Sequence, residues 1–356
     1  MVTKPGKIKL VSNTLYGEVQ GHITEGGALV MQREPVRVSQ LLLVISFFIV
    51  TTTLVGCNDL PVFQNDETKD LAVIRQQPVT VYYVTQEGDY LVPVNTKVSL
   101  DDDICRYVVE RVLAGPHDTD LREALSSPFP RGVLLKYIYV KDGRVCVDLG
   151  GEAIGTMDPK LWRQALSSLV FTLTEMPDVD IKSIEVLVNG VPDNNMVLER
   201  PAYINLIPGE PDDGLPITVF FSYNDTCLVP VTVKLAPETT DVLKATLDQL
   251  VAGPRGIPYL SSVFPEGTRL LDYRIEGDLL SLNFSKEAVL RDIKGNIRKE
   301  EQSPTVGSLA LTLRRFAGID CFEILIEGTP LIEQKLKVPR SYLDLENITK
   351  AQPEQG

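Results

Sequence analysis

Histidine and cysteine are scarce in this sequence, which limits the chemistry that depends on them. The 356 residues include two histidines, His22 and His117, and five cysteines without a Cys-x-x-Cys pair. These counts exclude a histidine-rich metal site and argue against zinc. The sequence also lacks a glycine-rich phosphate loop, a Gly-x-Ser-x-Gly motif and a Cys–His catalytic motif. We therefore predict no catalytic, cofactor-binding or metal-binding residues, and a protein that is not an enzyme.

Positive charge is also in short supply. Lysine and arginine number 35 against 48 acidic residues, which gives a net charge of −13. Without a basic stripe to displace counterions from phosphates, nucleic acid is excluded as a partner. The same charge argues against electrostatic adhesion to anionic lipid. The apolar content of 44% over this length is typical of a globular protein with two ordinary domains.

Long apolar runs are absent except for one near the N-terminus. Residues 41–56 read LLLVISFFIVTTTLVG, follow two arginines and precede Cys57. They fall short of the ~20 residues of a spanning helix but suit the apolar region of an export signal. The ending Leu-Val-Gly-Cys resembles a bacterial lipobox, in which the cysteine thiol receives diacylglycerol before cleavage. We predict that Cys57 is the lipidation site, the alternative being an uncleaved signal anchor with an incidental cysteine.

The regions around this signal differ in character. Residues 1–56 are predicted to be an N-terminal extension with the lipoprotein signal peptide, and the sequence favours Met31 over Met1 as the true start. Because residues 1–56 contain five basic and three acidic residues, the chain from Cys57 onward has a net charge of −15. Residues 57–77 are polar and without periodicity, so we expect the lipidated cysteine and a flexible tether there. The predicted location is the outer face of the cytoplasmic membrane.

The rest of the chain contains an internal duplication. The matched pairs are PVTVYY (78–83) with PITVFF (216–221), LVPV (91–94) with LVPV (228–231), VLAGP (112–116) with LVAGP (250–254), FPRG (129–132) with FPEG (264–267), VCVDL (145–149) with LSLNF (280–284), and IKSIEVLVNGVP (181–192) with IDCFEILIEGTP (319–330). Six pairs in one order predict two copies of one domain, at 78–192 and 216–332. Residues 193–215 are then a linker, and residues 333–356 a C-terminal tail.

Superposing the copies predicts a ββαββαβ unit of α+β class, with two helices packed on one face of a sheet. Gly115 and Gly253 follow the last apolar positions of a helix, which favours a left-handed helix stop over a binding loop. In the second copy, Thr240 is predicted to cap this helix. Asp142-Gly143 and Gly277-Asp278 are typical of two-residue hairpins.

Several acidic and cysteine side chains are candidates for a functional role. Glu185 and Glu323 recur at equivalent mid-strand positions, which indicates a solvated face and not a paired-carboxylate active site. Asp148 aligns with Asn283, a replacement that a catalytic carboxylate would not tolerate. Each copy contains two cysteines, Cys105 with Cys146 and Cys227 with Cys321. The sequence allows either a disulfide within each copy or buried free thiols.

The lipobox followed by the two ordered sets of segments resembles the GerM lipoproteins, which carry two GerMN domains. The likeness covers about 78–330. It implies a role in sporulation and germination, on the mother-cell membrane facing the forespore, with protein partners in the channel complex between the two cells. The GerMN domain is similar to the ring-building motif, which implies ring-like homo- or hetero-oligomers. The family carries no catalytic residues, so none is transferred.

The leading hypothesis is therefore a non-enzymatic adaptor that binds proteins at the membrane. Two alternatives are a peptidoglycan hydrolase and a solute-binding lipoprotein, and a deep cleft with clustered acidic residues would favour the enzyme. For an adaptor, we expect partner contacts at the divergent loops after the AGP phrases. Asp118 and Asp120 are predicted to lie there on an acidic outer face.

Overall fold

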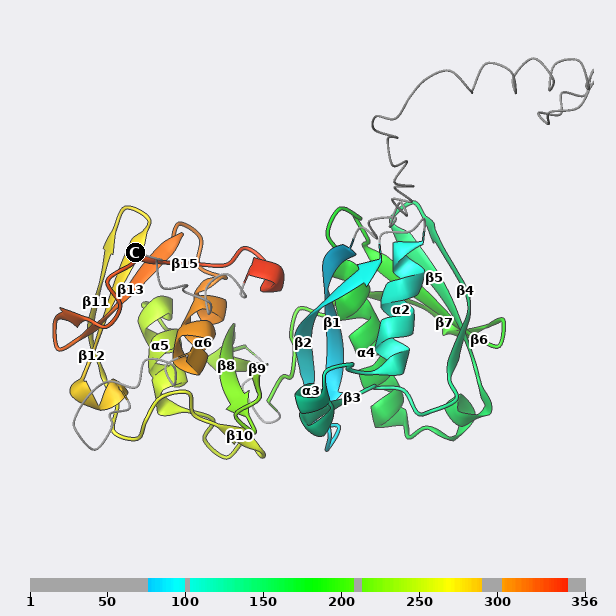
Figure 1. The fold of residues 1–356 in the computed structure, drawn as a ribbon, viewed down its shortest axis with the longest axis horizontal. Coiled ribbons are helices and arrows are strands. Elements are labelled where there is room, and N and C mark those ends of the chain that lie inside the picture. Colours follow the sequence, from blue (N-terminus) through cyan, green and yellow to red (C-terminus); the bar gives the residue numbers. More distant parts are fainter. Residues whose placement is uncertain (1–75, 100–102, 208–212, 290–302, 345–356) are drawn as a thin grey trace, which may run out of the picture. The chain divides into compact units, whose positions relative to one another are not determined.

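The structure is a computed structural model that describes residues 76–99, 103–207, 213–289 and 303–344 (Figure 1). The signal peptide, Cys57 and the tether up to residue 75 lie outside the described residues, whereas Gln76 and Gln77, expected in the tether, begin the first strand. Both repeats belong to one compact unit, Ala72–Gly356. Within the described ranges, no helix combines the length and the apolar character needed to cross a bilayer.

The duplicated α+β organisation is confirmed. The first repeat contains β1 (Gln76–Thr85), β2 (Leu91–Ser99), α2 (Ile104–Ala114), α3 (Thr119–Ala124), β3 (Leu125–Ser126), β4 (Leu134–Lys141), β5 (Arg144–Gly150), η1 (Glu152–Thr156), α4 (Pro159–Thr174), β6 (Ser183–Val188) and β7 (Val191–Glu199). The second contains β8 (Leu215–Tyr223), β9 (Cys227–Leu235), α5 (Val242–Ala252), β10 (Leu260–Ser261), β11 (Leu270–Glu276), β12 (Leu279–Phe284), η2 (Lys286–Ala288), α6 (Ser303–Leu313), β13 (Cys321–Ile326) and β14 (Thr329–Pro330), followed by β15 (Leu336–Lys337) and η4 (Tyr342–Asp344).

The layering differs from the prediction in one respect. Each repeat has two sheets, β2-β1-β3 and β4-β5-β6-β7 in the first, β10-β8-β9 and β11-β12-β13-β14 in the second. The first hairpin of each repeat is therefore a separate layer and not an added edge. Helices α2 and α4 contact β1 on one side and β4 and β6 on the other, so they lie between the sheets (Figure 1). The burial of all residues of α6 from Thr305 to Leu313 has the same cause, because a helix between two layers has no solvent face.

Helix side chains complete the hydrogen bonding of the first hairpin. The Tyr82 carbonyl accepts from Ser168 Oγ at 2.5 Å, and the Tyr82 amide donates to Thr172 Oγ1 at 3.0 Å. In the second repeat, Ser308 Oγ donates to the Phe220 carbonyl at 2.6 Å. Since a buried strand edge must satisfy its backbone groups, the hydroxyls of α4 and α6 replace a neighbouring strand there.

The AGP phrase is a helix stop, as predicted, with a different backbone conformation. Helices α2 and α5 end at Ala114 and Ala252, and the following glycines have positive φ, 80° at Gly115 and 74° at Gly253. Their ψ values, −178° and −177°, are extended and not left-handed helical. Non-glycine residues almost never occupy this region, so the requirement for glycine is stricter than a left-handed cap would impose.

Other local predictions can be checked in the same way. The predicted cap Thr240 is wrong by one residue, because the Asp241 carboxylate accepts from the Lys244 amide at 2.9 Å. Asp142 and Gly143 both have positive φ, which confirms the first predicted hairpin turn. Strand β7 pairs with β6 and runs across residue 192, where the first domain was expected to end. The loop after Pro116 contains the short helix α3, which begins after Asp118.

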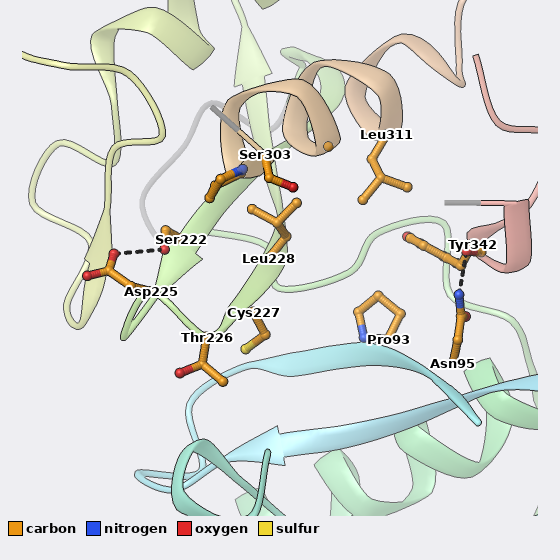
Figure 2. Close-up of a pocket in the computed structure, with 12 residues that line it drawn as sticks. Pro93, Asn95, Ser222, Asp225, Thr226, Cys227, Leu228, Ser303, Leu311 and Tyr342 are labelled. Carbon is orange, nitrogen blue, oxygen red and sulfur yellow. Dashed lines mark hydrogen bonds between the residues drawn. The ribbon is translucent and has the colours of Figure 1, made fainter. Parts of the chain in front are cut away.

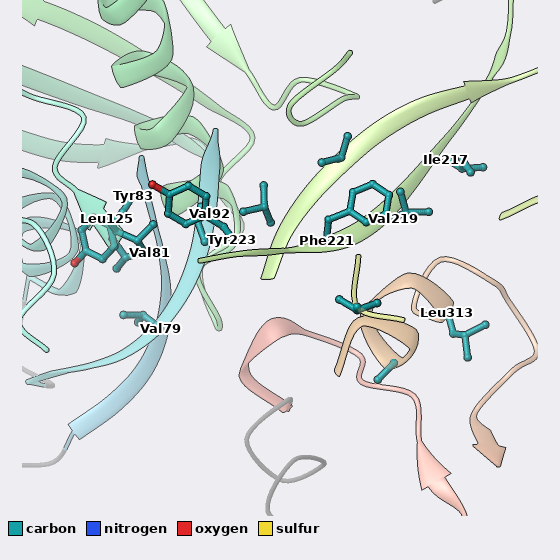
Figure 3. Packing of buried hydrophobic residues seen from close by; sticks show 14 of the residues in the cluster. Val79, Val81, Tyr83, Val92, Leu125, Ile217, Val219, Phe221, Tyr223 and Leu313 are labelled. Atoms are coloured by element: carbon teal, nitrogen blue, oxygen red, sulfur yellow. The ribbon is translucent and has the colours of Figure 1, made fainter. Parts of the chain in front are cut away.

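The apolar core draws on both repeats. Figure 3 shows Val79, Val81, Tyr83, Val92, Leu125, Ile217, Val219, Phe221, Tyr223 and Leu313 in one cluster of buried side chains. Alternate residues of β1, among them Tyr82 and Val84, belong to a second cluster. Strand β1 is thus buried on both faces, which requires a further layer beyond its own repeat.

Candidate functional site

The acidic positions singled out in the sequence have structural roles. Asp148 Oδ1 accepts from the Gly190 amide at 2.9 Å, and Asn283 Oδ1 accepts from the Gly328 amide at the same distance. Both bonds hold the turn after the adjacent strand, and an amide oxygen serves as well as a carboxylate. The alignment of Asp with Asn therefore follows from a shared structural task.

Glu185 on β6 and Glu323 on β13 are half-buried. Each lies opposite a residue of the neighbouring parallel strand, β5 or β12. Glu323 accepts a hydrogen bond from Ser281 Oγ at 2.6 Å, whereas Glu185 lies opposite Cys146. Within the part of the chain that the structure describes, no three His, Cys, Asp or Glu side chains are placed to hold a metal ion. Asp103 caps α2, and its neighbours Asp101 and Asp102 lie outside the described residues.

The four described cysteines are free thiols, so neither repeat contains the disulfide that the sequence left open. Cys105 and Cys146 are buried, and Cys227 and Cys321 are half-buried. Burial, with a smaller contribution from Asp103, raises the pKa of the Cys105 thiol to about 11. Burial raises that of Cys227 to about 12. Such thiols carry little thiolate at neutral pH and are poor nucleophiles.

The most developed polar and aromatic arrangement joins the two repeats, and we call it the junction. Its apolar members are Tyr82, Val84, Leu91 and Phe171 of the first repeat, Ile204 of the connecting segment, Phe220 and Leu311 of the second repeat, and Tyr342 near the C-terminus. Strands β2 and β9 also contact each other. The further layer that buries the second face of β1 is therefore the other repeat, together with two segments that follow the repeats.

Tyr342 lies at the centre of the junction. Its side chain is 7% exposed, with ring centroids 6.2 Å from Tyr82 and 6.1 Å from Phe220. Its carbonyl accepts from Asn95 Nδ2 at 2.6 Å, as Figure 2 shows. Burial raises the pKa of the Tyr342 hydroxyl. One side chain of the C-terminal segment thus contacts both repeats.

A charged triad lies beside these rings. Glu175, at the end of α4, pairs with Arg200 at 2.5 Å and with Arg314 of the second repeat at 3.5 Å. The Arg314 guanidinium lies 4.1 Å from the centroid of the Tyr342 ring, and that of Arg200 lies 4.8 Å from the Phe171 ring. The side chains of Glu175 and Arg314 are only 15% and 16% exposed, so each charge depends on its partners for solvation.

Asn205 links the two LVPV segments. Its amide nitrogen donates to the carbonyls of Leu91 at 2.8 Å and Pro230 at 2.7 Å, and its side-chain oxygen accepts from the Leu91 amide at 2.8 Å. The positive φ of Asn205, 49°, directs the side chain between the hairpins, a conformation that asparagine tolerates well. The repeated LVPV phrase therefore meets at the junction.

A recess of about 290 Å³ opens at the junction (Figure 2). Its walls include Pro93, Cys227, Leu228 and Leu311, and its one ionisable carboxylate, Asp225, lies 3.4 Å from Ser222 Oγ. A single carboxylate beside a hydroxyl does not supply the two-carboxylate geometry of a glycosidase. The recess is better described as an imperfectly filled contact than as a catalytic cleft.

The duplicated fold can now be set against known proteins. The family model described as "Germane: Sporulation and spore germination" matches residues 80–194 and 218–332, which together include nearly all of both repeats. The chain belongs to the Germane family. Among curated proteins, the spore germination protein GerM of Bacillus subtilis (strain 168) is 38% identical over 121 residues. That match spans 32% of this chain and 31% of the length of GerM.

The Germane fold is also that of a solved structure. The tandem GerMN domains of the sporulation protein GerM from Bacillus subtilis superpose with a TM-score of 0.55 at 20% identity. The match covers 74% of this chain and 98% of the solved one. The predicted recognition, a GerM-type protein with two GerMN domains, is confirmed.

Sequence reasoning missed most of the junction. Arg200 and Asn205 were assigned to a linker and Tyr342 to a tail. Glu175 and Arg314 were not singled out. The only signal for them was the unbroken apolar run of β1, VYYV, which indicates burial on both faces of the strand. Cys57, the single predicted site residue, lies outside the described residues.

Proposed function

We propose that this Germane protein is a lipid-anchored, non-enzymatic adaptor in endospore formation and germination. Cys57 would hold it on the outer face of the mother-cell membrane, facing the forespore. There it would support assembly or localisation of the channel complex between the two cells. Family membership and the lipobox support the place and process, and the described fold supports the adaptor role.

The junction is the observation that carries the adaptor role. Tyr342, Asn205 and the triad around Glu175 connect two similar domains through buried and half-buried side chains, and Asp148, a carboxylate considered for catalysis, holds a turn. A chain built this way presents two related surfaces in a fixed relation, which suits a component that must bind two neighbours at once. An enzyme would require convergent catalytic groups at one site.

Lipidation is tested by Cys57→Ala in cells labelled with a fatty-acid analogue. We expect the label to be lost from the chain, because no other cysteine follows an export signal. Label retained by the variant would contradict the anchor. The control is Cys227→Ala, which should keep the label.

The adaptor role is tested by recovering the lipidated chain from sporulating cells. We expect channel-complex proteins to co-purify, and purified peptidoglycan to remain intact when incubated with the chain. Degradation of peptidoglycan would overturn the adaptor role in favour of a hydrolase. An intact cell wall with no co-purifying protein would leave neither hypothesis standing.

A further inference from the structure

Strands β4 and β11 are equivalent edges of the two larger sheets, and both expose apolar side chains. Each is the first strand of its sheet, so its outer side pairs with no other described strand. On β4, Leu134 and Tyr137 are 65% and 57% exposed; on β11, Ile275 is 48% exposed. An exposed apolar edge strand is a template for pairing with another chain. These edges are therefore candidate contact surfaces.

The two edges differ in charge. Lys141 ends β4, and Asp272 and Glu276 lie on β11. Neither Lys141 nor Asp272 forms an ion pair with any residue that the structure describes. Each edge thus has a charge that a partner could neutralise.

The regular parts of the two edges have the same length. The β4–β5 pairing is irregular between Leu135 and Tyr137, and the β11–β12 pairing is irregular between Leu270 and Asp272. The regularly paired stretches that remain are 137–141 and 272–276, each of five residues. Aligned antiparallel, the opposed pairs are Lys141 with Asp272, Val140 with Tyr273, Tyr139 with Arg274, Ile138 with Ile275, and Tyr137 with Glu276. The alignment therefore places a cation against a carboxylate and an arginine against an aromatic ring, both of which stabilise cross-strand pairs.

Backbone alternation agrees with this alignment. In a two-residue hairpin, the residues that flank the turn bond to each other, and alternate residues then direct their backbone groups outward. Lys141 and Glu276 flank such turns, so the outward groups belong to Val140 and Ile138 on β4 and to Ile275 and Tyr273 on β11. These are the residues that the alignment sets opposite each other.

Pairing between identical edges is less favourable. Two β11 strands aligned antiparallel about Arg274 would set Asp272 against Glu276 twice, and like charges directly opposite are destabilising. Two β4 strands aligned antiparallel about Tyr139 would set Lys141 against Tyr137 twice, so neither lysine would face a carboxylate. Lys141 therefore finds an opposite charge on β11 and none on a second β4.

We propose that β4 of one copy pairs antiparallel with β11 of a second copy, so that copies associate head to tail. Such a contact is heterologous, because each copy uses a different strand on each side. It continues into a row that closes as a ring or extends as a filament, depending on the rotation between copies. The contact requires neither the lipid anchor nor a channel partner, so it can fail or hold independently of the proposed function.

Charge exchange tests the pairing in the full chain, held in detergent micelles. Lys141→Glu or Asp272→Lys should each weaken concentration-dependent association about tenfold, and the double variant should restore it. Lys97→Glu makes the same charge change on β2, in a sheet that contains neither edge, and should have no effect. Circular-dichroism melts check that every variant folds. A wild-type chain that stays monomeric at all concentrations, or a double variant no better than the single ones, would overturn the proposal.

A cross-linking experiment distinguishes the partner strand. Copies carrying Lys141→Cys are mixed with differently tagged copies carrying Asp272→Cys, and a short bis-maleimide is added. We expect cross-links between the two tags above the background of the wild-type cysteines. Cross-links formed by the Lys141→Cys copies alone would assign the contact to paired β4 strands and refute the head-to-tail arrangement.

Discussion

Replacing Tyr342 with alanine should uncouple the two repeats. The side chain is 7% exposed and packs on Tyr82, Phe220 and Arg314. Burying an aromatic side chain removes roughly 150–250 Å² from water, worth about 4–6 kcal/mol as an upper estimate at ~25 cal/mol per Å². Measured truncations of large aromatic core residues cost about 3–5 kcal/mol. We expect a loss of about 3–5 kcal/mol in the free energy of unfolding.

The single tryptophan makes the test specific to one repeat. Trp162 lies on α4, where its indole donates to Asp193 at 2.9 Å, so its fluorescence reports on the first repeat alone. Circular dichroism reports on both repeats. In the chain from residue 58 onward, the two signals should share one denaturation midpoint. In Tyr342→Ala they should separate, because each repeat then unfolds with its own stability.

Tyr342→Phe is the matched control. It keeps the ring and removes only the hydroxyl, so the expected loss is about 1 kcal/mol and the two midpoints should still coincide. The reasoning would be refuted if Tyr342→Ala lost less than about 1 kcal/mol and both probes kept one midpoint. The C-terminal segment would then not stabilise the junction.

Three further predictions follow from local geometry. Gly115→Ala should destabilise the chain by about 1–3 kcal/mol in thermal melts, because φ is 80° and a Cβ would lie 3.3 Å from the Ser127 nitrogen. The control is Gly155→Ala, at an open position without positive φ, which should be near neutral. Asp148→Asn should keep the turn at Gly190 and the stability, whereas Asp148→Ala should lose about 1 kcal/mol in urea titrations. Burial and the hydrogen bond to Glu87 raise the pKa of Tyr223 from about 10 to about 12, so its stabilising contribution is complete below pH 10 and lost as pH rises to 12. Phenolate absorbance near pH 10 that the wild type shows and Tyr223→Phe lacks would contradict this.

Asp118, predicted to lie with Asp120 on an acidic outer face, also has a structural role. Its carboxylate accepts from the amides of Asp120 and Leu121 and caps α3. Reversing its charge would remove a helix cap, worth about 1 kcal/mol, along with any partner contact. Glu123, exposed on the same helix, is the better position for testing electrostatic binding.

Local rules explain which parts of the fold were predictable. The hairpin at Asp142-Gly143 and the helix stops at Gly115 and Gly253 depend on residues within a few positions of each other, and both are confirmed. The duplication was visible because it is a comparison of the sequence with itself. Apolar periodicity then placed the helices.

The same local rules do not predict how the sheets and helices are layered. Whether the first hairpin joins the main sheet or covers the other side of the helices depends on contacts such as Ser168 with Tyr82, 86 residues apart. The junction is harder still, since Tyr342 carries no local signal of its partners. A lone tyrosine in a polar tail is indistinguishable in sequence from an exposed one.

The position of Tyr342 near the end of the chain has a consequence for how the protein matures. Asn95 and Tyr342, which hydrogen bond, are 247 residues apart. Loop closure over such a separation comes late and slowly compared with contacts inside a repeat. During synthesis and export, the first repeat can collapse around its own helices while Tyr82 still lacks its cover. We expect the segment that contains Tyr342 to dock on the two repeats last. Chains truncated before Tyr342 should fold but leave an apolar surface around Tyr82 uncovered, and should therefore aggregate.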